Sequence, residues 1–171
     1  MTLRQRPGRV QYLRLQHLRR RLLDARQLRR HSLTAGQRAR QAANLANGST
    51  LLGLAVAGAA RTRLQRGPRG LVLAAGYGWP LPVAGAFTLG NVVLCRCSTE
   101  ALLDRPELLG HEEKHCSQYA WCLGLPFIPL YLLAAGWSML RTGNPGTGNV
   151  FERRAGLLAG GYPVHGKKAW S

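Results

Sequence analysis

The sequence predicts a small α+β domain, in which a short sheet is followed by helices and a basic helical arm comes in front. Three observations support this fold class. The 171 residues suffice for one globular domain with a core, but are few for two domains. Arginines crowd the first 40 residues, and strand-forming residues precede the strongest helix signals. We therefore expect an arm of residues 1–45 and a domain of residues 46–171.

The arm carries most of the unusual charge of the chain. Lysine and arginine number 24 against 7 acids, a formal net charge of +17, and twelve arginines face the single acid Asp24 within residues 1–40. Leucines at helical spacing between residues 10 and 30 predict a basic amphipathic helix. It could be a solvated helix docking weakly on the domain, or contact an anionic membrane surface. Nucleic acid is the weaker partner, since aromatic residues do not interleave with the arginines.

Uncharged segments predict the first elements of the domain. Residues 50–60 are apolar but too short to cross a bilayer, and they indicate a buried helix. The arginines of residues 61–69 predict a charged loop. Residues 71–94 are apolar but interrupted by glycine and proline, which favours two short strands and a turn. The second strand should be Phe87–Leu94, a run rich in β-forming residues.

A helix should follow these strands. Asp104, with Glu107 three residues later, has the pattern of a helix N-cap and its reciprocal partner. A glycine and a proline just after Leu123 should end this helix. The sequence thus predicts a helix of about 20 residues.

The segment of residues 120–140 has no charged residue and is long enough to span a bilayer as one helix. Gly124, Pro126 and Pro129 argue against one unbroken helix. We therefore expect a turn and then a buried helix over residues 129–140. A re-entrant or surface-embedded segment is the alternative.

The residues that point to chemistry lie in the first of these two helices. His111-Glu112-Glu113-Lys114-His115 places two imidazoles one helical turn apart, where both can bind one metal ion. Glu112 can lean over the open coordination position and take a proton from water. Random placement would give this pattern on the order of 0.004 times per chain of this composition. The alternative is a helix whose histidines only pack or face water.

The surroundings of this motif resemble a known family. Residues 109–119, Leu-Gly-His-Glu-Glu-Lys-His-Cys-Ser-Gln-Tyr, are similar to the HExxHxxQ helix of the zincin-like (gluzincin-like) metallopeptidases of bacteria. Gln118 extends the match beyond the five-residue motif. Phe87–Val93 resembles the edge strand that lines the substrate cleft of zincins. The resemblance, which covers about residues 85–165, implies Zn²⁺ as cofactor and a peptide or protein as substrate.

A catalytic zinc ion takes three protein ligands, so a third should lie downstream of the histidines. Glu152 stands in Asn149–Gly156, which resembles the Glu-x-x-Ala helix that supplies the third ligand in gluzincins. Asn149 and Glu152 could instead form a capping pair without a metal, with His165 as the reserve ligand.

The chain departs from the family pattern after this helix. Gly156 stands where an aspartate would orient a ligating histidine, so another group must do so. Tyr162 and His165 could donate a hydrogen bond to the oxyanion of an intermediate, although packing is the simpler role. Cys116 adjoins His115 but points elsewhere on the helix, which excludes it as a ligand.

The remaining features bear on setting and function class. Four cysteines are too few for a disulfide scaffold, and no signal-peptide core is visible; both indicate a cytoplasmic protein, with membrane association left open. The predicted function is a zinc-dependent peptidase with His111, His115 and Glu152 as metal ligands and Glu112 as the catalytic base. The rival is a non-enzymatic basic protein that binds membrane surfaces or nucleic acid and keeps a vestigial or structural metal site.

Overall fold

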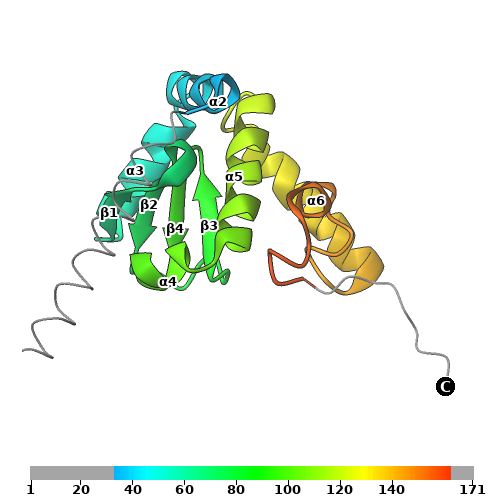
Figure 1. Cartoon of the computed structure of the whole chain (residues 1–171). Helices are drawn as coiled ribbons and strands as arrows, with labels where there is room; N and C mark the ends of the chain where they lie inside the picture. The colour runs from blue at the N-terminus through cyan, green and yellow to red at the C-terminus, as the bar shows by residue number, and fades with distance from the viewer. Residues whose placement is uncertain (1–32, 163–171) are drawn as a thin grey trace, which may run out of the picture. The chain divides into compact units, whose positions relative to one another are not determined.

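The computed structural model describes residues 33–162 (Figure 1). The predicted arm helix and His165 lie outside the described residues, so both stay predictions. The chain divides into two compact units, Met1–Thr34 and Ala35–Ser171. Helix α2 (Ala35–Ala46), which we had assigned to the arm, therefore belongs to the second unit. Among the described residues, every helix is too short or too polar to cross a membrane.

The second unit is α+β, as predicted. Its first half contains helices α2 and α3 (Ser49–Ala59), then strands β1 (Arg63–Arg66), β2 (Val72–Ala75), β3 (Ala86–Leu89) and β4 (Val92–Cys95), with the short 3-10 turn η1 (Pro68–Gly70) between β1 and β2. Its second half contains helices α4 (Thr99–Leu103), α5 (Pro106–Trp121), α6 (Phe127–Thr142) and α7 (Val150–Ala155).

The four strands form one mixed sheet in the order β1-β2-β4-β3. Strands β2 and β4 pair in parallel in the middle, with Val72 opposite Val92, and each outer strand pairs antiparallel with its neighbour. Strand β3 therefore lies at an edge. Helix α5 packs against β3, as Figure 1 shows in the yellow-green ribbon. This arrangement puts the helix that carries the histidine motif beside the β3 edge of the sheet.

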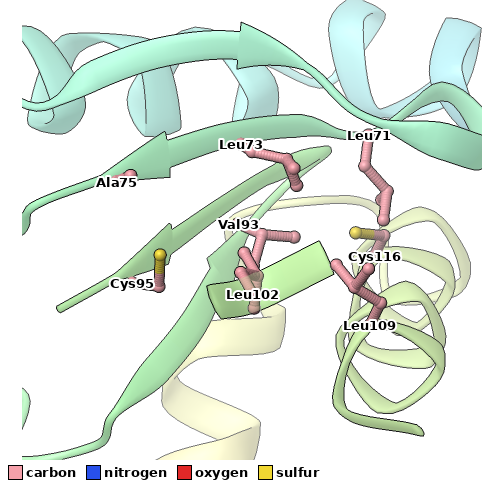
Figure 2. Close-up of a cluster of buried hydrophobic side chains, with 8 residues drawn as sticks. All are labelled: Leu71, Leu73, Ala75, Val93, Cys95, Leu102, Leu109 and Cys116. Atoms are coloured by element: carbon pink, nitrogen blue, oxygen red, sulfur yellow. The ribbon is translucent and has the colours of Figure 1, made fainter. Parts of the chain in front are cut away.

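Helices cover both faces of the sheet, so both central strands are buried. Leu73 and Val93 point to the side of α4 and α5, where they pack with Leu102, Leu109 and Cys116 (Figure 2). The alternate residues of the same strands pack against α3 on the opposite face. Because helices cover both faces, the sequences of these two strands are continuously apolar instead of alternating between apolar and polar residues. The predicted helix of residues 50–60 is confirmed as α3.

Two predictions for this part of the chain, a loop and a strand, need correction. Residues 61–69 are not only a charged loop, because β1 forms there with all four residues exposed. Charged side chains on an edge strand discourage pairing with other chains. They also leave the strand without the alternation of apolar and polar residues by which a strand is predicted from sequence. Phe87–Leu94 is a hairpin rather than one strand, since the chain turns at Gly90 (φ 62°) between β3 and β4. A Cβ at Gly90 would lie 2.3 Å from the Thr50 backbone nitrogen, so only glycine fits.

The helix boundaries also differ from the predicted ones. Asp104 is the C-cap of α4, and α5 begins after Arg105 without a side-chain cap, because Pro106 needs no hydrogen-bond acceptor at its nitrogen. Helix α6 begins at Phe127 and is not buried: Phe127 and Ser138 are its two buried residues. The sheet already has helices on both faces, and α6 packs chiefly on the short α7. Most of its apolar surface therefore faces solvent.

Candidate metal centre

Helix α5 brings the two histidines of the motif together. His111 and His115 are both buried, and their Nε2 atoms lie 3.0 Å apart. The spacing follows from helical geometry, since residues four apart share a face. The i, i+4 spacing of the two histidines therefore brings two imidazole nitrogens close enough to bind one ion.

Glu152 reaches the same point from α7. Its Oε2 atom lies 3.2 Å from His111 Nε2, and its Oε1 atom lies 3.5 Å from His115 Nε2. Atoms bound tetrahedrally at about 2.1 Å from a zinc ion lie about 3.4 Å from one another. The three side chains thus form a group that could hold a metal ion, with one atom from each within 4.8 Å of the others.

Hydrogen bonds to the Nδ1 atoms define the tautomer of each imidazole. His111 Nδ1 lies 3.1 Å from the Gly156 carbonyl oxygen, and His115 Nδ1 lies 2.8 Å from Gln118 Oε1. The Gln118 amide is itself oriented, because its Nε2 donates to the Phe151 carbonyl. Both partners of Nδ1 are acceptors, so each Nδ1 carries the proton. Each Nε2 then directs a lone pair into the centre, as a metal ligand must.

The electrostatics of the centre favour a cation. Burial opposes charge on Glu152, but the neighbouring His111 and His115 imidazoles outweigh it and lower the pKa of this carboxyl to about 2. Burial also opposes charge on His115, yet the Glu152 and Glu112 carboxylates raise its pKa overall. Glu152 Oε2 is buried without a hydrogen-bond donor. Two lone pairs and one carboxylate oxygen therefore converge where a cation would satisfy all three.

Glu152 is not the second member of a capping pair. The Asn149 side chain caps α7 by accepting a hydrogen bond from the Phe151 nitrogen at 3.0 Å. The Asn149 backbone nitrogen, which a capping-box glutamate would engage, donates instead to the Gly146 carbonyl. Asn149 thus begins the helix on its own, and Glu152 is left to face the histidines.

Glu112 lies beside the centre rather than within the ligand group. Its Oε2 accepts a hydrogen bond of 2.6 Å from Thr88 Oγ1, on the edge strand β3. Burial raises the pKa of Glu112, and the nearby charge of His115 and the Thr88 hydrogen bond only partly offset this rise. A buried carboxylate with a raised pKa is a better proton acceptor than an exposed one, which suits a general base.

Glu113 and Lys114, the two motif residues between Glu112 and His115, join α5 to its neighbours. Glu113 accepts hydrogen bonds from Arg40 at 2.8 Å and from Arg69 at 3.0 Å, which join α5 to α2 and to η1. Lys114 Nζ donates to the Ala155 carbonyl at the end of α7, at 2.9 Å. Each of the five residues from His111 to His115 therefore either lies at the centre or joins α5 to a neighbouring element.

Sequence reasoning missed several residues around the centre. Tyr131 of α6 donates a hydrogen bond to Glu152 Oε1. Gly160 packs on His111, since a Cβ there would lie 2.5 Å from His111 Cε1. The only available signals were weak: Tyr131 is a lone phenol in an apolar helix, and Thr88 is the lone polar side chain of its strand.

The structure also places Tyr162 and Cys116. Tyr162 lines the cavity next to the centre, and burial together with the charge of Glu152 raises its pKa. Cys116 is fully buried in the hydrophobic core and is not a member of the His-His-Glu group.

A cavity of about 920 Å³ reaches the centre. The edge strand β3 lines it through Phe87, Thr88 and Leu89, and α6 lines it through Ile128 and Leu132. Most of these side chains are apolar, and the charged or polar side chains of the lining include those of the centre together with Arg96, Arg105 and Glu107. A mostly apolar cleft with a few polar groups is typical of a ligand-binding site.

No protein-family model, curated protein or solved structure matches this chain. The resemblance to zincin-like metallopeptidases therefore depends on the motif residues alone. The fold and the site define a small α+β domain with a buried His-His-Glu group that could hold a metal ion.

Proposed function

We propose that this chain is a zinc-dependent peptidase. The observation that supports it is the donor set: two imidazole nitrogens and one carboxylate oxygen converge in the lining of a cleft. Structural zinc sites are closed by four protein ligands, whereas catalytic sites have three and leave a position open. His111, His115 and Glu152 are three such ligands, and Glu112 stands beside them.

Zinc held by these three residues would polarise the scissile carbonyl and make water more acidic. The chain's own residues would do the rest. Glu112, positioned by Thr88, accepts the proton of the attacking water and passes it to the leaving amine. Tyr131 holds Glu152 through Oε1 and leaves Oε2 for the metal. Tyr162, whose raised pKa keeps its hydroxyl protonated, can donate to the developing oxyanion.

The cleft also suits an extended polypeptide. Strand β3 is an edge strand and lines the cavity, so its free backbone groups can pair with a substrate strand. Phe87, Phe127 and Ile128 supply apolar walls, which would accept an apolar substrate side chain. We therefore propose unfolded or extended polypeptides with apolar side chains as the substrate class.

The test measures bound zinc and cleavage of a peptide library in parallel. Wild type should bind one zinc ion per chain and cleave. Changing Glu112→Gln should keep the metal and lower the cleavage rate about 10²- to 10⁴-fold, because only proton transfer is lost. The variants His115→Ala and Glu152→Gln should lose zinc and activity together.

Asp104→Asn is the matched control, since Asp104 is an exposed carboxylate just before the same helix and does not line the cavity. It should bind zinc and cleave like wild type. Cleavage by Glu112→Gln at the wild-type rate would show that Glu112 is not the base. A wild type that binds zinc but cleaves nothing would favour the rival, a structural or vestigial metal site.

A further inference from the structure

Helix α6 exposes an apolar face. Leu130, Leu133, Trp137 and Leu140 follow one another at helical spacing, and they are 46, 72, 59 and 85% exposed. We call these four residues the α6 face. Soluble monomers rarely expose large side chains of this kind together, and such patches mark interaction sites. Something should therefore cover this helix.

The charge around the α6 face indicates what covers it. From residue 116 to residue 151, Arg141 is the single charged residue, and carboxylates are absent. Its guanidinium lies 5.0 Å from the centre of the Trp137 ring, at the end of the face. Arg153 and Arg154, both exposed, follow on α7. An apolar helix face whose one charged neighbour in this segment is the arginine at its end complements an anionic lipid surface.

A second copy of the chain is a poorer occupant of the same face. Each copy carries a net charge of +17, so two copies repel each other. Tryptophan and arginine are also the side chains found where a bilayer meets water, because each combines an apolar body with a polar end. The composition of the face and its border thus favours lipid over protein.

We propose that α6 docks on an anionic membrane surface, lying in the plane of the interface with the α6 face among the lipids and Arg141 at the headgroups. A helix of 16 residues is too short to span the bilayer, so docking is peripheral. Ile128 and Leu132 belong to the same helix and line the cavity. Docking would therefore bring the cleft next to the membrane surface. The proposal does not depend on the metal or on catalysis.

The test is flotation of the full chain with phosphatidylcholine vesicles that contain or lack phosphatidylserine. Salt is raised until electrostatic binding by the basic N-terminal residues is screened, while burial of apolar side chains persists. The Leu133→Gln/Leu140→Gln variant should then bind anionic vesicles roughly tenfold or more weakly than wild type. The matched control is Leu51→Gln/Leu64→Gln, at leucines that are 57 and 51% exposed elsewhere on the unit. It should bind like wild type.

Two further measurements decide the outcome. Brominated lipids should quench wild-type tryptophan fluorescence, and Trp137→Phe should remove much of that quenching. Equal vesicle binding by the α6 variant and wild type would overturn the proposal, as would a wild type that ignores anionic vesicles. A dimer in sedimentation velocity that the Leu133→Gln/Leu140→Gln variant loses would assign the face to a second copy and likewise overturn it.

Discussion

Each imidazole of the candidate metal centre is oriented through its Nδ1 atom. The backbone carbonyl of Gly156 holds His111, and Gly156 is the residue that stands where the resemblance implies an orienting aspartate. Gln118 holds His115 and also the Phe151 carbonyl, one residue before Glu152. One amide side chain therefore positions two of the three ligands. Such outer contacts set the geometry of a metal site nearly as much as the ligands do.

The Gln118→Ala variant should bind zinc about 10- to 100-fold more weakly than wild type, because His115 loses its hydrogen-bond acceptor and α7 loses a tether. Competition with a chromophoric chelator measures the affinity. Ser117→Ala is the matched control, since the Ser117 hydroxyl donates to the Glu113 carbonyl of its own helix and, within residues 33–162, to no group of the centre. If Gln118→Ala bound zinc as tightly as wild type, the amide would have no part in positioning the centre.

The sequence predicts the site unequally at this scale. The proximity of His111 and His115 follows from helical spacing alone. Glu152 was found through the resemblance, because no local rule relates residues that far apart in the chain. Tyr131 and Thr88 could not be found, since their contacts depend on how α6 and β3 pack.

Helix α5 is joined to its neighbours by hydrogen bonds of Glu113 and Lys114. Glu113 forms an ion pair with Arg40, whose side chain is 6% exposed, and Lys114 donates a hydrogen bond to the end of α7. A buried arginine needs its partner, because an unpaired buried charge is costly. The link between α5 and α2 therefore matters for the stability of the unit and not only for the site.

Glu113→Ala should lower the free energy of unfolding by about 1–3 kcal/mol, because Arg40 then loses its charged acceptor. Urea unfolding followed by circular dichroism measures it. Asp104→Asn, at an exposed carboxylate that precedes α5, should stay within about 0.5 kcal/mol of wild type. Similar stability for the two variants would mean that the Arg40 link is solvated and contributes little.

The elements show which signals a sequence carries. Helix α3 and the apolar central strands were predicted because burial leaves an uncharged run. Strand β1 was not, because its side chains face solvent and only backbone pairing with β2 defines it. The hairpin turn at Gly90 was missed, although a Gly-Asn pair between β-forming runs is a turn signal.

At the scale of the whole molecule, a bound metal ion should stabilise the fold. The three ligands come from two helices, so the folded state binds zinc far better than the unfolded chain. Free zinc at about 100 times its Kd would add about 2.7 kcal/mol. The thermal midpoint should then rise by roughly 5–10 °C.

Differential scanning calorimetry with zinc and then with a chelator measures this shift. His115→Ala should not respond to either addition. A wild type whose midpoint is the same in zinc and in chelator would show that the folded chain has no preferred zinc site.

The sequence predicted the α+β class of the whole domain. It could not predict the exposure of α6, because that depends on which surfaces the other elements leave uncovered.

The separation of the ligands along the chain has one more consequence. His115 and Glu152 enclose residues 116–151, a segment that contains all of α6. A metal ion shared by the two would act as a removable cross-link and close this segment into a loop, so that opening of the segment would have to release the ion. Loss of the ion would release both ends at once. The supply of metal would then govern how long the proposed membrane-docking helix survives proteolysis.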